Sequence, residues 1–444
     1  INFNNISAFD YGIYIHTDIY GDLKINENNI QAGITGIRYS SPPPSYFLYG
    51  NVEIKDNTID TSANSGDAIV MEHMAIYGTA EINCNTIAAG SSNYGIYLEL
   101  VYNDTMINNN TLTGGYGIGI REVYGEVRIN ENTITFKHNG IEITYCYNDI
   151  EINSNNLNSN TISEHNAIII GGFIGEVYGA VRIQRNMINL SHSEDIGITI
   201  GGLDTIYGKV TILRNVIDPT TDFLAGILIT DWIGPHSLIA HNTIYRVNVL
   251  GIGLVWIPVL EKIAVKNNIV VGTSSAITIG ISGGVSGNCT SGVGFNNLWN
   301  CNLASSTWDP AHGDISEDPI FVDPTAKDFH LQGTSPCIDA GIDLGLPYEG
   351  EAPDMGAYEC KALFTLTFLV TDSDTGLPIE NAEVTVDGNT QYTDPDGKTS
   401  FELPPGDYSY TVSKPQYYPA SGTIHLTADT LKEVSLKPVP PISD

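Results

Sequence analysis

One six-residue pattern, apolar-x-x-Asn-x-apolar, recurs through the first 300 or so residues and limits what this chain can fold into. Residues 152–157 (INSNNL) are a representative copy. The fourth-position asparagines are Asn4, Asn28, Asn57, Asn85, Asn110, Asn132, Asn155, Asn186, Asn215, Asn242, Asn268 and Asn296. Successive asparagines are separated by as few as 22 residues (110 to 132) and as many as 31 (155 to 186). A repeat period in this range indicates a solenoid.

Between the hexads, two further segments recur. The first alternates glycine or alanine with isoleucine, as in residues 117–120 (GIGI) and 140–143 (GIEI), and such alternation of β-branched residues predicts short strands. The second is a Tyr-Gly pair, in which Asn103 and Asn148 replace glycine in two copies, and this substitution predicts a positive φ there. A short strand then leads into the next hexad.

These patterns predict an all-β fold, a right-handed parallel β-helix of about 12 coils over residues 1–300, followed by a small β-sandwich. The aliphatic residues of each hexad are expected to stack inward. Each fourth-position asparagine is expected at a turn, where its amide can bond the backbone of a neighbouring coil. The tyrosines of the Tyr-Gly pairs are expected to stack in a row along the solenoid.

The composition limits the partners. The chain has 444 residues and 42% hydrophobic content, which is enough for two or more folded units. It carries 19 Lys and Arg against 51 Asp and Glu, and the resulting net charge of −32 opposes binding to nucleic acid or anionic lipid. Because the sequence contains no run of eighteen apolar residues, no membrane span is predicted.

After the repeats, the sequence changes to residues 318–324 (DPIFVDP), 328–331 (DFHL), 335–341 (SPCIDAG) and 354–359 (DMGAYE). This run resembles the closing segment of a large family of secreted bacterial and archaeal right-handed β-helix proteins with pectate-lyase-like repeats. The resemblance implies that residues 301–362 form the terminal coils and the C-terminal cap. It also implies a secreted or surface-exposed protein, but it carries no single activity.

Residues 363–438 contain six or seven short alternating segments separated by turns rich in Asp, Pro and Gly, which predict a β-sandwich. Residues 371–386 (TDSDTGLPIENAEVTV) and 393–419 (TDPDGKTSFELPPGDYSYTVSKPQYYP) resemble carboxypeptidase-regulatory-like, or Ig-like, sandwich domains. This resemblance implies a non-catalytic appendage of an extracellular protein. Residues 439–444 form a Pro-rich tail.

The cysteines suggest two local disulfides. Cys289 and Cys301 flank a glycine-rich loop, and Cys337 and Cys360 bracket the end of the solenoid, so each pair could close a bridge. The spacing of the cysteines and histidines does not suit a zinc site.

Weak catalytic candidates lie just past the Gly-Ile-x-Ile strands. There Glu72, Glu99 and Arg121 are expected at equivalent positions of successive coils. Adjacent coils would place the two carboxylates about 5 Å apart, near the separation in a retaining glycosidase, with Arg121 lowering the pKa of one of them. The competing interpretation, which we favour, is a solvated row of charges on an acidic surface.

Asp231, Trp232 and Trp256 are predicted on loops of later coils, where aromatic rings beside polar groups could stack on sugar faces. Alternatively, these rings only cover the apolar edges of coils. A further candidate site concerns calcium, because Asp372, Asp374, Asp394 and Asp396 offer oxygen ligands in two turns. Their spacing does not match a complete loop site, and ordinary Asx-turns are the favoured interpretation. No other cofactor is predicted.

Together these features predict a non-catalytic structural or adhesive protein of the cell surface or extracellular space. Because Ile1 lies inside the first hexad, we expect that chain precedes it and that an uncapped coil end allows head-to-tail assembly into filaments. The expected partners are therefore other copies of the chain or cell-surface glycans. The alternatives are a polysaccharide lyase or glycoside hydrolase, and a glycan-binding protein.

Overall fold

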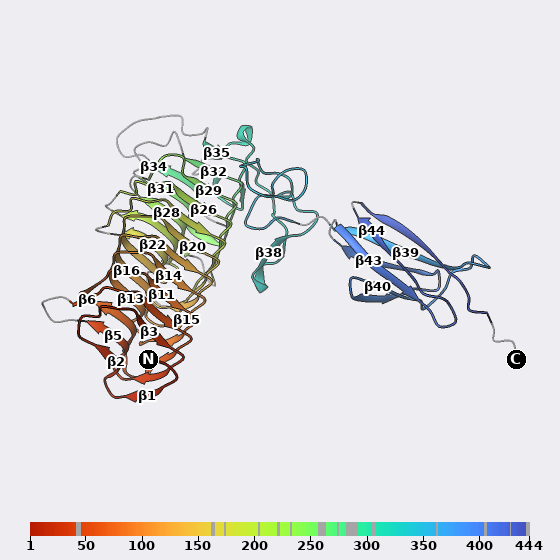
Figure 1. Ribbon diagram of the computed structural model, residues 1–444. Helices are drawn as coiled ribbons and strands as arrows, with labels where there is room; N and C mark the ends of the chain where they lie inside the picture. Colours follow the sequence, from red (N-terminus) through yellow and green to blue (C-terminus); the bar gives the residue numbers. More distant parts are fainter. Residues whose placement is uncertain are drawn as a thin grey trace. The chain divides into compact units, whose positions relative to one another are not determined.

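The computed structural model describes residues 1–40, 46–160, 165–172, 175–202, 205–219, 223–230, 233–255, 263–272, 275–280, 292–303, 308–360, 363–403, 406–426 and 428–440. The chain forms two compact units. The first comprises residues 1–348 and 352–359, and the second comprises residues 349–351 and 360–444. Both are built almost entirely from β-strands (Figure 1).

The first unit is a parallel β-solenoid, as predicted, with three sheets that we name A, B and C. Sheet A contains β3 (Leu23–Asn26), β7 (Val52–Lys55), β11 (Ala80–Asn83), β14 (Thr105–Asn108), β17 (Val127–Asn130), β20 (Ile150–Asn153), β23 (Val181–Gln184), β26 (Val210–Leu213), β29 (Leu238–Ala240), β32 (Ala264–Lys266) and β35 (Val293–Gly294). Sheet B contains β1 (Asn5–Ala8), β4 (Asn29–Ala32), β8 (Thr58–Asp60), β12 (Thr86–Ala88), β15 (Thr111–Thr113), β18 (Thr133–Phe136), β21 (Asn156–Ser159), β24 (Met187–Leu190), β27 (Val216–Pro219), β30 (Thr243–Tyr245), β33 (Ile269–Val271) and β36 (Asn297–Trp299).

Sheet C is formed by the Gly-Ile-x-Ile segments. It contains β2 (Tyr11–Ile15), β5 (Thr35–Ser40), β9 (Asp67–Glu72), β13 (Tyr94–Val101), β16 (Tyr116–Val123), β19 (Ile141–Cys146), β22 (Asn166–Gly172), β25 (Ile196–Gly202), β28 (Phe223–Thr230), β31 (Val247–Val255) and β34 (Ser275–Gly280). The short strands β6 (Tyr46–Leu48) and β10 (Met74–Ile76) pair beside this path, and one 3-10 turn, η1 (Ser62–Asn64), precedes β9. Neighbouring strands in Figure 1 belong to successive coils, one stacked on the next.

The solenoid has about nine turns, so the prediction of twelve coils is wrong. Counting hexads overestimates the turns because the copies at the two ends belong to incomplete coils. Asn4 is exposed, whereas Asn28 is only 2% exposed. At the other end, the last copy lies between β35 and β36, where sheet C has already ended.

Each hexad forms the corner that joins a strand of sheet A to a strand of sheet B. In the representative copy, β20 ends at Asn153 and β21 begins at Asn156. The flanking aliphatic residues Ile152 and Leu157 are both fully buried in the core. The hexad is therefore a turn whose two apolar ends are held by hydrophobic burial, as the sequence predicted.

The fourth-position asparagines form a buried ladder that runs parallel to the solenoid axis. The Oδ1 of Asn155 accepts hydrogen bonds from the backbone N–H and the Nδ2 of Asn132, both at 2.9 Å. The Asn155 Nδ2 in turn donates to Oδ1 of Asn186 at 3.0 Å and to the carbonyl of Ile129 in the preceding coil at 2.8 Å. The same side-chain bond recurs from Asn4 through Asn296, so each amide bonds both neighbouring coils.

The ladder ends at an aspartate. Oδ1 of Asp314 accepts from the backbone N–H and the Nδ2 of Asn296, while its Oδ2 accepts from the backbone N–H of Asp309. Asp314 is 4% exposed, and this burial raises the pKa of its carboxyl group. A carboxylate accepts hydrogen bonds but donates none, so it suits the last position of a chain of donors.

Positive φ angles occur at a different place from the one predicted. The residue before the ladder asparagine has a left-handed conformation in every coil, as at Glu131 (φ 58°) and Ser154 (φ 56°). The glycine of the Tyr-Gly pair instead allows the backbones of neighbouring coils to pack closely, because a Cβ at Gly78 would lie 2.3 Å from the carbonyl oxygen of Gly50. Asn103 and Asn148 are not among the residues with positive φ, so that expectation is wrong.

Residues after the last coil fold against the solenoid. They include η4 (Pro310–His312), β37 (Phe321–Asp323), η5 (Pro324–Ala326) and β38 (Asp328–Leu331). The backbone N–H of Gly356 donates to the carbonyl of Asn267 at 2.7 Å, and that of Ala357 donates to Oγ1 of Thr243 at 3.0 Å. This segment lies against the hexad corners of later coils, and its role as a C-terminal cap stays a prediction.

The structure differs from the predicted bridge between Cys337 and Cys360. Cys337 is a free, fully buried cysteine, and its Sγ lies 2.9 Å from Nδ2 of Asn297. The sulfur is therefore turned toward the last coil of the solenoid, and burial raises the pKa of its thiol to about 11. Cys289 lies outside the described residues, so its predicted bridge to Cys301 stays a prediction.

The second unit is a two-sheet β-sandwich, as predicted. One sheet contains β42 (Lys398–Leu403), β39 (Phe364–Asp372) and β45 (Thr430–Leu436), and the other contains β41 (Asn389–Tyr392), β40 (Glu383–Val386), β43 (Gly406–Ser413) and β44 (Ala420–Leu426). Its core includes Phe368, Val384 and Val412, each fully buried. Across both units, no helix within the described residues is long and apolar enough to cross a membrane.

Replacement of Asn155 by alanine tests the ladder. The change leaves the backbone N–H of Asn132 without an acceptor, removes one hydrogen bond of its Nδ2 and breaks the ladder to Asn186, so we expect a loss of about 2–4 kcal/mol in the free energy of unfolding. Asn153→Ala is the matched control, because Asn153 points outward and its side chain accepts a bond only from Ser154. Urea unfolding measures both, and equal midpoints would contradict the role of the ladder.

Acid is expected to weaken the contact between the cap and the solenoid through His241. Its Nδ1 lies 3.0 Å from the carbonyl of Asp354, and burial, helped by the charge of Arg214, lowers its pKa from 6.5 to about 4. As the pH falls below 6.5, His241 becomes protonated in the unfolded chain before it does so in the folded protein. The free energy of unfolding therefore decreases as the pH falls from 6.5 toward 4. The loss approaches about 3 kcal/mol.

The variant His241→Gln removes this titrating group. Its unfolding free energy should fall less between pH 7 and pH 4.5 than that of the unchanged protein, because all other groups titrate in both. Urea unfolding at the two pH values measures the difference. Parallel pH dependences would rule out a contribution from His241.

Candidate functional site

The outer face of sheet C brings the predicted catalytic residues into one row. The register pairs Leu98 with Met71 on one side and with Ile120 on the other. The next residue of each strand is Glu99, Glu72 or Arg121, so these three lie at equivalent positions of successive coils, as the sequence suggested.

Each carboxylate in this row is held by a different arginine. Glu99 Oε1 lies 2.7 Å from Nη1 of Arg121, and its Oε2 accepts the backbone N–H of His73. Glu72 forms an ion pair with Arg38, from the preceding coil. Both oxygens of Glu99 are therefore engaged, which fits a structural row of ion pairs better than an acid and a nucleophile that share one bond. Their assignment to catalysis stays a prediction.

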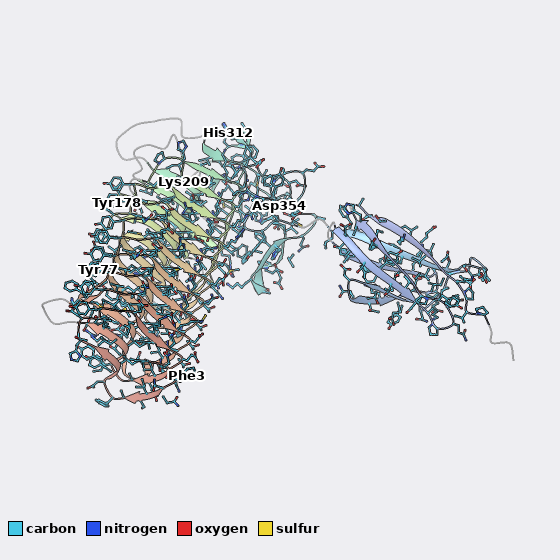
Figure 2. The ribbon with its side chains drawn as sticks, in the orientation of Figure 1. Phe3, Tyr77, Tyr178, Lys209, His312 and Asp354 are labelled. Carbon is cyan, nitrogen blue, oxygen red and sulfur yellow. The ribbon has the colours of Figure 1, made fainter. Side chains whose placement is uncertain are left out.

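Two rows of aromatic rings frame this face of sheet C. The first, which we call the tyrosine ladder, consists of Tyr20, Tyr49, Tyr77, Tyr102, Tyr124, Tyr147, Tyr178 and Tyr207. Neighbouring rings are stacked, with centroids 4.3 Å apart at the closest pair and 5.3 Å at the widest. Figure 2 shows Tyr77 and Tyr178 at the outer edge of the solenoid. The predicted row of tyrosines is therefore present, and its edges reach solvent.

The second aromatic row lies at the other end of the sheet C strands. Tyr94 stacks on Tyr116 at 4.6 Å, Tyr116 lies against His138 at 4.7 Å, and His138 meets His165 edge to face at 4.7 Å. The Nδ1 of His138 is 3.2 Å from Nε2 of His165. The two rows thus bound a trough whose floor is the outer face of sheet C.

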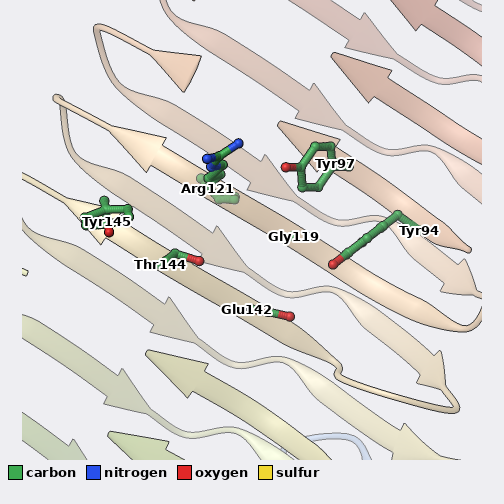
Figure 3. A pocket seen from close by; sticks show the side chains of 8 residues that line it. Tyr94, Tyr97, Gly119, Arg121, Glu142, Thr144 and Tyr145 are labelled. Atoms are coloured by element: carbon green, nitrogen blue, oxygen red, sulfur yellow. The ribbon is translucent and has the colours of Figure 1, made fainter. Parts of the chain in front are cut away.

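A cavity of about 320 Å³ opens on this floor around Gly119. Figure 3 shows Gly119 between Tyr97 and Glu142, which lie on the two neighbouring strands. The full lining consists of Tyr94, Tyr97, Gly119, Ile120, Arg121, Glu142, Thr144 and Tyr145. We call this cavity the Gly119 notch, after the glycine in its lining.

A second depression of about 380 Å³ lies beside the notch, toward the tyrosine ladder. It is lined by Phe47, His73, Met74, Ala75, Tyr77, Glu99, Leu100, Tyr102, Arg121 and Glu122. Arg121 lines both spaces and therefore forms the wall between them.

Tyr94 and Tyr97 of the notch remain protonated at neutral pH. Burial is the main reason why the pKa of Tyr94 is raised. Burial, followed by the negative charge of Glu99, also raises the pKa of Tyr97. Both phenols can therefore donate and accept hydrogen bonds at the surface of the notch.

Comparison with known proteins assigns the second unit. Residues 365–437 match the carboxypeptidase regulatory-like domain. This match confirms the resemblance predicted for the sandwich, and it leaves the solenoid unassigned. No curated protein is significantly similar to the chain.

The predicted calcium ligands lie in turns of the carboxypeptidase regulatory-like domain. Oδ1 of Asp372 accepts the backbone N–H groups of Asp374 and Thr375, each at 2.9 Å, and these contacts lower the pKa of Asp372. Oδ1 of Asp394 similarly accepts from Asp396 and Lys398. These are Asx-turns, the interpretation favoured from the sequence. Within the described residues, no group of three or more His, Cys, Asp or Glu side chains could hold a metal ion.

The sugar-stacking candidates Asp231, Trp232 and Trp256 fall outside the described residues. The notch itself was missed by the sequence reasoning, although a signal was present. The third position of the Gly-Ile-x-Ile segment is glycine at Gly119 and Gly253, while the equivalent position in other coils carries larger residues. The register of the sheet C strands is needed to show which residues surround Gly119.

Addition and chelation of calcium test whether the aspartate turns of this domain bind the ion. Because the aspartate oxygens already accept backbone hydrogen bonds, we expect EDTA and added calcium to leave the unfolding temperature of the protein unchanged. Differential scanning calorimetry of the full chain measures this, with magnesium as the control for ionic strength. A rise in the unfolding temperature with calcium alone would indicate a genuine site in these turns.

Proposed function

We propose that this protein is a non-catalytic structural or adhesive surface protein. The observation that carries the proposal is the pairing of the candidate carboxylates. Glu99 is bonded to Arg121 and His73, and Glu72 is paired with Arg38, so neither is disposed as a general acid beside a partner carboxylate.

The form of the solenoid supports the same proposal. Its coils are joined by the buried asparagine ladder on the inside and by stacked tyrosines on the outside. Such repeated contacts between neighbouring coils favour a stiff element that holds a binding face in a fixed geometry. The carboxypeptidase regulatory-like match adds a domain of a type that resembles non-catalytic appendages of extracellular proteins. An extracellular or cell-surface location is part of this proposal.

A polysaccharide lyase or glycoside hydrolase is the alternative, because Glu99 and Glu122 line an open depression. Head-to-tail assembly of the solenoid also stays a prediction. The alternative enzyme and the adhesive protein differ in what they do to a polysaccharide over time, since an enzyme consumes it and an adhesive protein only holds it.

Incubation of the full chain with neutral and acidic polysaccharides tests this difference. We expect no new reducing ends and no unsaturated products. Beads coated with the chain should instead be retained under flow on a film of neutral polysaccharide, acidic polysaccharide or protein.

Beads coated with an unrelated protein of similar acidic charge serve as the control for non-specific retention. Cleavage that the Glu99→Gln variant abolishes would establish the enzyme instead. Retention on none of the films would contradict an adhesive role.

A further inference from the structure

We propose that the Gly119 notch binds one residue of a neutral saccharide chain, with the adjoining depression receiving a neighbouring residue. This inference names a ligand class for the adhesive function proposed above, and in that respect it rests on that proposal. The site differs from the tryptophan loops suggested by the sequence.

The notch lies where one outward row of sheet C has a glycine between Tyr97 and Glu142. The register aligns Val70, Tyr97, Gly119, Glu142 and Ile169 on successive strands. A Cβ at Gly119 would lie 2.5 Å from Cε1 of Tyr94 and 3.1 Å from Cδ2 of Tyr97. The Tyr94 ring therefore packs directly on the Gly119 backbone, and any larger residue at this position would displace the tyrosine rings that line the notch.

A second glycine of the same row, Gly253, has different neighbours. At Gly253, a Cβ would meet the side chains of Leu250 at 2.3 Å and Leu228 at 3.1 Å. Aliphatic groups therefore close in on that position, whereas phenol rings and polar groups surround Gly119. The two glycines thus differ in the chemistry of their neighbours, and those of Gly119 can form hydrogen bonds.

The chemistry of the lining matches a sugar ring. Tyr94, Tyr97 and Tyr145 supply aromatic surface on which the C–H face of a pyranose can lie. Around them, Glu142 and Thr144 offer hydrogen-bond acceptors and a hydroxyl group at the rim. An apolar surface with a few convergent polar groups is the usual form of a small-ligand site.

The charges around the notch favour a neutral ligand. Arg121 is the one cation in the lining, and it is already paired with Glu99 at 2.7 Å. Glu142 lies in the notch and Glu122 in the adjoining depression, and the chain as a whole carries −32. A uronate or sulfated sugar would approach uncompensated carboxylates and be repelled, whereas hydroxyl groups can donate to them.

The two depressions together point to a chain of sugar residues. Arg121 lines both of them, and they lie between the two aromatic rows of the trough. The side chain of Arg121 is 59% exposed, so it can donate to groups that span both spaces. An oligosaccharide should therefore bind more tightly than its monosaccharide.

Isothermal titration of the full chain with neutral gluco-, manno- and galacto-oligosaccharides tests the proposal. We expect saturable binding of at least one of them, with weaker binding of the matching monosaccharide and none of uronic acid oligomers. The variant Gly119→Val should weaken binding by about tenfold or more, because its side chain displaces the tyrosine rings that line the notch. Valine is a fair choice, since Val70 occupies the same position two coils away.

A second variant, Tyr97→Ala, removes the ring without adding volume, and it should also weaken binding by about tenfold. The matched control is Tyr14→Ala, because Tyr14 is an exposed tyrosine of the same row, outside the lining of the notch. That variant should bind as the unchanged chain does. Thermal unfolding of each variant separates loss of binding from loss of folding.

The absence of binding by any neutral oligosaccharide would overturn the inference, as would a preference for uronic acid oligomers. Binding that is unaffected by Tyr97→Ala and by a folded Gly119→Val would overturn it too. Beads that adhere to a protein film while the soluble chain binds no sugar would remove the notch proposal and leave the adhesive function standing. Sugar binding without bead retention would support the notch proposal and contradict the adhesive function.

Discussion

The buried hydrogen bonds of the asparagine ladder are the interaction on which the rest of the solenoid depends. A primary amide inside an apolar core is costly unless its donors and its acceptor are satisfied. Here each Oδ1 accepts two hydrogen bonds from one neighbouring coil, and each Nδ2 donates to the other neighbour and to backbone carbonyls, as at Asn155. An asparagine in one coil therefore requires an asparagine, or a terminal acceptor such as Asp314, at the same height in the next.

This requirement fixes the register of the coils. The turn that places each ladder asparagine also introduces backbone strain. The residue before each ladder asparagine has φ near +55°, although none of these residues is glycine, and a left-handed conformation costs such residues about 1 kcal/mol or more. The fixed corner aligns the strands of sheets A and B from coil to coil. The loops of variable length lie outside this corner. Alignment on sheet C follows, so Tyr97, Gly119 and Glu142 become neighbours although 22 or more residues separate them along the chain.

A face built in this way suits a binding function in which the side chains that contact the ligand are held in fixed positions. The ion pairs of Glu72 and Glu99 and the stacked rings of the tyrosine ladder restrain the side chains of the trough. Irregular positions such as Gly119 then provide the few places where a ligand can enter. The strong negative charge keeps polyanions away without contributing to the fold, which leaves uncharged partners as the chemistry that this face accommodates best.

The sequence by itself determined the parallel solenoid, the inward hexads, the tyrosine row and the regulatory-like sandwich, because each depends on a local period or a short motif. It also placed Glu72, Glu99 and Arg121 in one row. Only the tertiary structure decided that these charges pair separately, that the end coils are incomplete and that Cys337 faces Asn297. It alone decided that the residues around Gly119 line a cavity. The reason is physical: a repeat fixes what every coil shares, but contacts between coils depend on the different side chains that the register brings together.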